Sequence, residues 1–211
     1  MLSVKTNKTL VFTRRLWYTT RDMALQEPYY WYVLYVRTNA EKRVVEDMSR
    51  YIAERGFECP IEPFCPQSES YYRNKSERML GKEYRRRPLF PGYIFAETQM
   101  PPELFITQMG DFIYRSTDIV RLLRMSGDAS SIAVPTEERR RLEFLLTGKR
   151  CVEHSVGYIV GDRVCVNSGP LKDREGLITY INRHNRYADI EVELFGSKIK
   201  ARVALEIVDK K

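Results

Sequence analysis

The sequence is poor in the residues and motifs from which most catalytic and metal sites are built. Only two histidines occur, His154 and His184, and they lie too far apart in the chain to suggest an acid–base pair. No C-x2-C pair is present, so the cysteine spacing matches no zinc site. G-x-S-x-G, P-loop and paired-carboxylate motifs are also absent. We therefore expect neither an enzyme nor a bound metal or other cofactor.

Long apolar runs are missing as well. No stretch approaches the roughly 18 residues that a membrane span needs. Residues 1–28 contain three arginines but no continuous apolar segment of the kind found in signal peptides. We expect no membrane partner and a flexible N-terminal extension over residues 1–28. The cysteines are expected to be reduced thiols of a cytoplasmic protein; they are Cys59, Cys65, Cys151 and Cys165.

What is abundant is positive charge and ordinary core material. The 211 residues include 35 Lys and Arg against 28 Asp and Glu, which gives a net charge of +7. Hydrophobic residues make up 43% of the chain, enough for one large or two small domains. The basic balance is compatible with a polyanionic partner but does not by itself require one.

The pattern over residues 29–147 predicts an α+β domain. Residues 30–36 are aromatic and β-branched throughout and predict a central strand. The TNAE stretch at 38–41 predicts a capping box before an amphipathic helix, which Gly56 would end. A return strand is expected over 89–96, entered by a Pro-Gly turn. The sequence further predicts helices at 102–109 and from 134 to about 147, and a strand at 118–123. This order indicates an antiparallel sheet with helices on one face.

Residues 148–211 show a different pattern, with a linker and then only strands. Residues 148–156 show little periodicity and are the expected linker. Residues 157–211 contain only short alternating strands, expected at 163–167, 176–182, 187–194, 198–203 and 205–208, which predict a small SH3-like barrel. Within it, the segment 160–178 combines alternating valines, a Gly-Pro turn and the charged loop 172–175. Such short loops on small barrels commonly bind partners.

Several motifs together resemble one protein family. The motifs, in chain order, are Trp31-Tyr32, EKRV at 41–44, LFPGY at 89–93, VPTEE at 134–138 and the KOW-like segment at 160–178. Residues 193–208 are similar to that family's closing strands. The order and separation resemble NusG-type transcription elongation factors over about residues 30–210. The resemblance implies an NGN-like domain that binds RNA polymerase and a tethered KOW barrel, in a monomer that controls elongation or antitermination.

Some features depart from general NusG proteins. Residues 71–87 form a long basic connection with a triple arginine, and the loop 171–175 is unusually charged. These departures resemble the specialised LoaP group of antiterminators. The alternatives are a general NusG-like factor, a ribosome-associated KOW protein, and a nucleic-acid enzyme that uses the barrel for targeting. The ribosome-associated alternative does not account for Trp31, LFPGY and the α+β domain, and the sequence offers no metal-ligand cluster for the enzyme alternative.

The resemblance implies that the N-terminal domain docks on the polymerase clamp helices through an apolar patch. By motif position, Phe90, Tyr93 and Phe95 fall on that patch. Period two places Tyr93 and Phe95 on one face of their strand, and exposed aromatic anchors supply most interface energy. The alternative from the pattern alone is that all three are core aromatics of the sheet.

Two arginines of the same domain are candidates for contact with non-template DNA. Arg37 follows the first strand and Arg43 lies in the first helix, with Tyr35 close in sequence. Cationic grooves beside aromatic rings hold single strands. The alternative is a solvated helix face. The basic connection at 71–87 is a candidate for phosphate contact or a solubilising loop; its cations are Arg73, Lys75, Arg78, Lys82, Arg85, Arg86 and Arg87.

The barrel carries the RNA-binding candidates in two turns and a closing strand. They are Lys172, Arg174, Arg183, His184, Arg186, Lys198 and Lys200. We expect the two turns to form a patch for RNA loops or phosphates if they meet at one end of the barrel. Residues 157–211 hold ten Lys and Arg against eight Asp and Glu, a net charge of only +2. Local placement must therefore provide any RNA specificity. The alternative partners of the barrel are a ribosomal protein or a termination factor.

Overall fold

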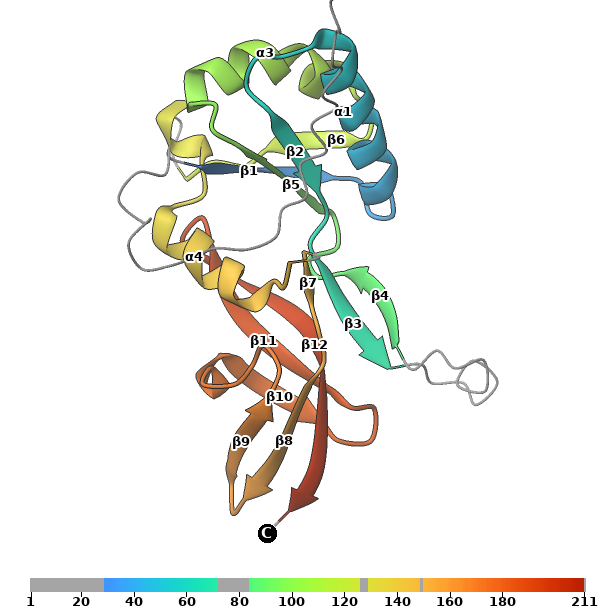
Figure 1. Ribbon diagram of the computed structural model, residues 1–211, viewed down its shortest axis with the longest axis vertical. Helices are drawn as coiled ribbons and strands as arrows, with labels where there is room; N and C mark the ends of the chain where they lie inside the picture. Colours follow the sequence, from blue (N-terminus) through green and yellow to red (C-terminus); the bar gives the residue numbers. More distant parts are fainter. Residues whose placement is uncertain (1–28, 72–83, 126–128, 149, 211) are drawn as a thin grey trace, which may run out of the picture.

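The computed structural model describes residues 29–71, 84–125, 129–148 and 150–210. The expected N-terminal extension and the tip of the basic connection, with Arg73, Lys75, Arg78 and Lys82, lie outside these residues. Figure 1 shows an α+β part at one end of the long axis and a barrel at the other, with α4 and a hairpin between them.

The N-terminal part is built on a four-stranded sheet in the order β2-β5-β1-β6. Its strands are β1 (Tyr30–Val36), β2 (Ile61–Phe64), β5 (Tyr93–Thr98) and β6 (Ile119–Leu122), and the neighbours pair antiparallel. The predicted central strand is therefore confirmed, because β1 lies between β5 and β6 and is buried along most of its length. The α+β class predicted from the sequence is confirmed too.

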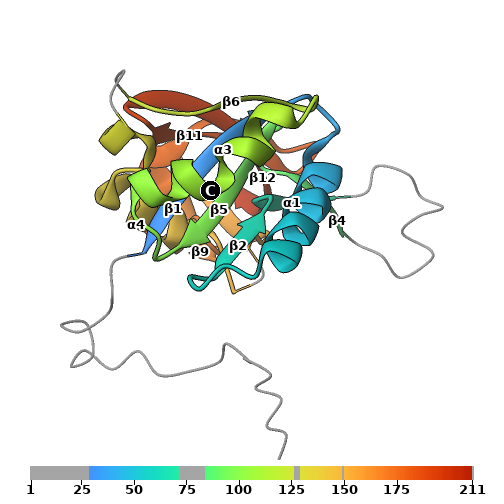
Figure 2. The ribbon, with the colours of Figure 1, turned by 90° about the horizontal axis from the view of Figure 1, so that it is seen from above.

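Helices α1 (Glu41–Arg55) and α3 (Pro102–Arg115) cover one face of this sheet (Figure 2). Gly56 ends α1 in the left-handed region at φ 60°, as the sequence predicts. The predicted capping box is wrong: Ala40 is the N-cap and no side chain caps the helix. Glu41 is buried and instead accepts a 2.7 Å hydrogen bond from the Gly92 amide, which joins the start of α1 to the LFPGY turn.

A hairpin leaves this sheet and runs beside the barrel. Strands β3 (Gln67–Tyr71) and β4 (Tyr84–Pro88) pair antiparallel, and β7 (Cys151–Val152) adds to β3 in parallel. Helix α4 (Thr136–Leu145) follows the short 3-10 turn η2 (Ala129–Ile132) and lies between the sheet and the barrel (Figure 1). Both segments therefore bring residues of the N-terminal part against the barrel.

The barrel is a five-stranded sheet in the order β10-β11-β12-β8-β9. Its elements are β8 (Ser155–Val160), β9 (Arg163–Ser168), the 3-10 turn η3 (Glu175–Leu177), β10 (Ile178–Asn182), β11 (Tyr187–Leu194) and β12 (Ser197–Lys210). Two predicted strands, 198–203 and 205–208, are one continuous strand, β12, which pairs with β11 and then in parallel with β8. Strand β8 was not predicted.

The sheet's two faces lead into two separate apolar clusters. One contains Tyr32, Leu34 and Ile94 and lies under α1 and α3. The other joins residues of β1 and β5 to α4 and to the barrel's interior. The segment expected as a linker contributes Val152 to this second cluster, and its Cys151 is fully buried too. The proposed boundaries, 29–147 and 157–211 around a linker at 148–156, thus enclose a segment that is packed over part of its length.

Candidate functional site

The face of the sheet turned toward the barrel is rich in aromatic rings. Phe95 is fully buried, Phe90 is 1% exposed, and Tyr93 is half-buried. Trp31 contacts Phe95 edge-on at 5.8 Å between ring centroids, and Phe64 at 5.5 Å. The structure thus brings the three polymerase-binding candidates onto one face of the sheet, two of them out of contact with solvent.

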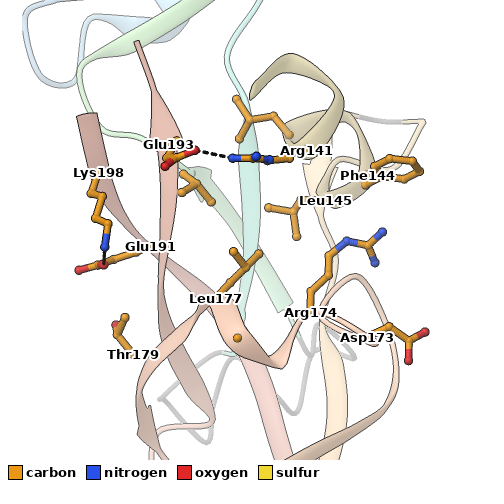
Figure 3. A pocket seen from close by; sticks show the side chains of 13 residues that line it. Arg141, Phe144, Leu145, Asp173, Arg174, Leu177, Thr179, Glu191, Glu193 and Lys198 are labelled. Atoms are coloured by element: carbon orange, nitrogen blue, oxygen red, sulfur yellow. Dashed lines mark hydrogen bonds and ion pairs between the residues drawn. The ribbon is translucent and has the colours of Figure 1, made fainter. Parts of the chain in front are cut away.

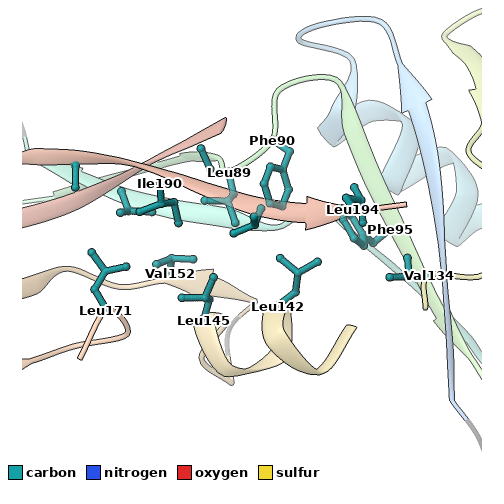
Figure 4. Packing of buried hydrophobic residues seen from close by; sticks show 14 of the residues in the cluster. Leu89, Phe90, Phe95, Val134, Leu142, Leu145, Val152, Leu171, Ile190 and Leu194 are labelled. Atoms are coloured by element: carbon teal, nitrogen blue, oxygen red, sulfur yellow. The ribbon is translucent and has the colours of Figure 1, made fainter. Parts of the chain in front are cut away.

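The cover over this aromatic face comes from the barrel and α4. Leu171, Ile190 and Leu194 of the barrel, and Leu142 and Leu145 of α4, are all buried in the same cluster. Figure 4 shows Leu89 and Phe90 beside the barrel strand that carries Ile190, and Leu142 and Leu145 of α4 pointing toward that strand. A partner that uses Phe90 or Phe95 must therefore displace the barrel.

A buried carboxylate fastens α4 to the barrel. Glu138 is 8% exposed and accepts hydrogen bonds from the Phe195 amide at 2.6 Å and the Gly196 amide at 2.9 Å. These two residues form the turn between β11 and β12, and both have positive φ. One helical turn further on, Arg141 pairs with Glu193 of β11.

A second fastening lies where the chain passes from α4 to the barrel. Arg150 donates to Glu97 at 2.6 Å, and the Trp31 indole donates to the same carboxylate at 2.8 Å. The Arg150 guanidinium also lies 4.2 Å from the centroid of the Phe64 ring. Glu97 is almost fully buried, and a buried carboxylate needs compensation. The Arg150 guanidinium and the hydrogen bonds that Glu97 accepts provide it.

The β3–β4 hairpin makes the third set of contacts with the barrel segment. The Tyr71 hydroxyl donates to Glu206 of β12 at 2.9 Å. His154, just before β8, stacks on Tyr84 with ring centroids 4.5 Å apart and contacts Glu69 through Nδ1 at 3.2 Å. The basic connection predicted at 71–87 is therefore anchored at its base, where Arg85, Arg86 and Arg87 lie on β4.

The two DNA-binding candidates lie near one another at the end of the sheet. The Arg43 guanidinium pairs with Asp118 at 2.6 Å, and the Arg37 amide donates to the Asp118 carbonyl at 2.8 Å. Both arginines are exposed. Tyr35 contacts Tyr93 rather than either arginine, at 5.2 Å between ring centroids, and its cationic neighbour is Arg121, 5.9 Å from the ring.

The charged loop after β9 is held rigidly. Leu171 is fully buried and its amide donates to Ser155 Oγ at 3.2 Å. Glu175 accepts a 2.9 Å hydrogen bond from the Val166 amide, which lowers the pKa of this carboxyl below its usual value. At Gly169, φ is 92° and a Cβ would lie 2.5 Å from a backbone oxygen, so only glycine fits. The loop presents Lys172 to solvent from a fixed frame.

The second predicted RNA turn faces a different part of the molecule. Arg183 and His184 are exposed, but Arg186 lies 5.1 Å from the Tyr71 ring centroid and 3.4 Å from Glu206. Arg174 of the first turn instead contacts Phe144 of α4. Each turn therefore directs one arginine at the N-terminal part, and the two arginines contact different elements: Arg186 contacts β3 and Arg174 contacts α4.

The lysines of the closing strand stand opposite carboxylates. In the register of β11 and β12, Lys198 faces Glu193 and Lys200 faces Glu191. The Lys198 ammonium also lies 3.7 Å from Glu191. These pairs cancel much of the local positive charge, so Lys172, Arg174, Arg183 and His184 remain the more exposed or uncompensated RNA candidates.

Four residues that shape this region were not among the sequence candidates: Glu138, Phe144, Arg150 and Tyr71. One of them carried a visible signal. Phe144 lies between Leu142 and Leu145 but off the apolar stripe of its helix, and an aromatic residue on the polar side invites a functional reading. The others have no local signal, because their partners lie on distant segments.

Within the described ranges, no group of three or more His, Cys, Asp or Glu side chains is arranged to hold a metal ion. The helices of the described part are too short or too polar to span a membrane.

Comparison with known proteins points in one direction. The family model described as "Transcription termination factor nusG" matches residues 29–143, more than half of the chain. The protein named "Transcription termination/antitermination protein NusG" from Borreliella burgdorferi is 26% identical over 191 residues, 85% of this chain and 97% of that protein. Its namesake from Thermus thermophilus is 27% identical over 169 residues, 79% and 90% of the two chains. A solved structure titled "Domain interaction in Thermotoga maritima NusG" covers 85% of this chain and 94% of that one, with 24% identity and a TM-score of 0.48.

Proposed function

This chain belongs to the NusG family and is a NusG-like transcription termination/antitermination factor, and on that premise we propose that it binds RNA polymerase through its aromatic sheet face. The observation that carries the proposal is the gathering of Phe90, Tyr93 and Phe95 on one face. That face is covered by the barrel and α4 rather than by α1 and α3. Polymerase engagement requires the barrel to move, because Phe90 and Phe95 are otherwise inaccessible.

Once bound, the N-terminal domain bridges the polymerase cleft and disfavours the open, paused state by differential binding. Arg37 and Arg43 lie close enough to contact the non-template strand together, although Arg43 must exchange Asp118 for a phosphate. The released barrel stays tethered, which raises its effective concentration near a second partner.

For the barrel we propose RNA as that partner, with Lys172 and Arg174 of the rigid loop and Arg183 and His184 of the second turn as the first contacts. Lys198, Lys200 and Arg186 contribute less in the packed form, since each has an acidic side chain nearby. The charged loop and the long hairpin favour a specialised, LoaP-like antiterminator. The named relatives favour the general NusG role, which stays the second candidate.

The polymerase proposal is tested by pull-down with the full chain. Tyr93→Ala removes a half-exposed ring of the aromatic face and is expected to weaken polymerase capture about tenfold, a typical cost for an interface anchor. Tyr114→Ala is the matched control, because Tyr114 is 90% exposed and lies on α3, over the other face. Equal capture by the two variants would contradict the proposed surface.

The RNA proposal is tested by gel shift against a hairpin and an unstructured RNA. Charge reversal at Lys172 and Arg174 is expected to weaken binding and reduce its salt dependence. Lys42→Glu, on the exposed side of α1, is the control for net charge. Equal, weak and salt-sensitive binding of both RNAs would favour the general NusG role over a LoaP-like one.

A further inference from the structure

A groove lies between α4 and the barrel (Figure 3), and two of its lining residues, Leu142 and Leu145, also pack in the cluster of the aromatic sheet face. Its volume is about 520 Å³, within the range of small-ligand sites and large enough for a nucleobase. One wall is the helix and the other is formed by β11, β12 and the segment around η3. Phe90, Tyr93 and Phe95 do not line this groove.

The groove has an apolar floor and an aromatic ring at its mouth. Leu142, Leu145 and Val192 line it and are buried. Phe144 is 68% exposed, and the Arg174 guanidinium lies 5.1 Å from its ring centroid. An exposed ring beside a guanidinium is the arrangement on which unpaired bases stack in RNA-binding proteins.

The charges around the groove are unevenly compensated. Arg141 is paired with Glu193, and Lys198 with Glu191 at 3.7 Å. Arg174 instead donates to the Lys172 carbonyl at 3.0 Å and contacts the Phe144 ring. Asp173 also lines the groove, but Figure 3 shows its carboxylate beyond Arg174, away from the two glutamates. Arg174 is therefore the cation best placed to meet a phosphate at this mouth.

We propose that this groove takes one unpaired base of the RNA, stacked on Phe144, with the adjoining phosphate at Arg174 and Lys172. The inference rests on the proposed RNA binding of the barrel and names a site for it. Guanine is the preferred base, because the wall opposite Phe144 carries the carboxyl groups of Glu191 and Glu193, whose oxygens accept hydrogen bonds. The Watson–Crick edge of guanine presents two adjacent donor groups, N1–H and the N2 amino group, whereas each of the other bases presents one.

Unlike a patch on the barrel alone, the groove exists only in the packed arrangement of the molecule. Its two walls belong to the two halves of the molecule, so the base binds only while α4 and the barrel are packed together. A ligand that binds one arrangement stabilises it. Occupation of the groove and exposure of Phe90 therefore oppose one another, and polymerase engagement releases the base while the loop phosphates can stay on the barrel.

The test is fluorescence anisotropy of the full chain with two 5′-labelled RNA heptamers, UUUGUUU and UUUUUUU. The guanine heptamer is expected to bind more tightly. Phe144→Ala should weaken its binding on the order of tenfold, the usual cost of losing one stacked base, and remove the preference for guanine. Phe144→Tyr should keep both. Tyr114→Ala, an exposed aromatic on α3, should change neither.

The outcomes separate this inference from the function on which it rests. If the wild-type chain binds neither the heptamers nor the hairpin RNA, RNA binding itself fails and the groove fails with it. If it binds the hairpin but neither heptamer, only the groove is wrong. If the chain binds RNA and Phe144→Ala behaves like Tyr114→Ala, the groove is wrong and RNA binding stands. The groove assignment is also overturned if Phe144→Ala loses binding of a ribosomal protein while its RNA affinity is unchanged, since the groove would then take a protein side chain.

Crosslinking gives an independent reading on the unaltered protein. A heptamer with 6-thioguanosine at its centre is expected to crosslink to peptides from α4 and from the segment around Leu177. Crosslinks confined to the 183–186 turn or to the N-terminal sheet would overturn the assignment.

Discussion

Both faces of the N-terminal sheet are apolar, but they are covered in different ways. Tyr32, Leu34 and Ile94 pack under α1 and α3, which are parts of the same domain. Trp31, Val33 and Phe95 alternate with them along the same strands, but pack against α4 and the barrel. The period of two in a strand separates the sets, so neighbouring residues of β1 belong to different cores.

The difference is in what holds each cover in place. The helix-covered face is closed by segments that lie close in the chain and contribute mainly apolar side chains. The barrel-covered face is closed by apolar residues of α4 and of the distant barrel, and in addition by polar links at its edge, among them Glu138, Arg141, Arg150 and Tyr71. Such links can be exchanged for water, as at interfaces between domains. We therefore expect the second face, and not the first, to exchange its cover for another partner.

The largest effect is expected on the helix-covered face. Tyr32 is fully buried, stacks on Phe105 at 3.9 Å and donates to the Met100 carbonyl at 2.7 Å. Tyr32→Ala should lower the free energy of unfolding by about 3–5 kcal/mol, as for other large aromatic truncations. Urea denaturation measures this, with Tyr114→Ala as control. A loss below about 1 kcal/mol would show that this face is not a permanent core.

A smaller effect is expected where the barrel joins the sheet. Arg150→Met keeps much of the side-chain length but leaves the Glu97 carboxylate without its guanidinium. Removing one partner of a fully buried pair costs about 3–5 kcal/mol. Here we expect about 2–3 kcal/mol, since Arg150 is 20% exposed and Trp31 still donates to Glu97.

The same variant sharpens the comparison through the shape of its unfolding curve. For Arg150→Met we expect the barrel and the N-terminal domain to unfold in separate transitions. Trp fluorescence and far-ultraviolet circular dichroism measure the two transitions. A single transition with an unchanged m-value would mean that the barrel and the N-terminal domain unfold together, so that neither face is uncovered before the other.

The next prediction concerns the carboxylate that fastens α4. Glu138→Gln replaces charge-assisted hydrogen bonds to two amides by weaker ones, which should cost the packed form about 1–2 kcal/mol. Cys151 reports the change, because it is fully buried and burial raises the pKa of its thiol to about 11. Its alkylation should become about 5 to 30 times faster.

A neighbouring residue provides the control for that experiment. Glu137 lies on the exposed side of α4 and pairs with Arg140, so Glu137→Gln removes the same charge without touching the barrel. Cys165, half-buried on β9, serves as the internal reference for alkylation. Equal acceleration of Cys151 in both variants would show that charge, and not the Glu138 fastening, controls opening.

The smallest effect is expected within the barrel itself. The Val166 amide lowers the pKa of Glu175, so this carboxylate stabilises the fold above its unfolded-state pKa of about 4.3. That contribution disappears as the pH falls through the depressed folded-state pKa. Wild type and Glu175→Gln should therefore differ in Tm near neutral pH and converge in acid. Asp162→Asn, on an exposed turn, should follow wild type throughout.

Much of the fold could be predicted because it depends on local patterns. The aromatic run at 30–36, the spacing of apolar residues after Glu41 and Gly56 as a helix end all act over a few residues. The capping box failed for a tertiary reason: the Glu41 carboxylate binds the Gly92 amide instead of its own helix. Strand β8 was missed because the sequence around it resembles a linker, and its order depends on pairing with the distant β12.

The sequence by itself determined the family, the α+β class, the small barrel and the residue types of the aromatic face. It could not decide whether Phe90 and Phe95 meet solvent, because an aromatic on a strand has the same local pattern in a core and in an interface. Only the tertiary structure placed the barrel and α4 over that face. It did so through contacts such as Glu138 with the Phe195 amide and Arg150 with Glu97, whose partners lie more than fifty positions apart in the chain.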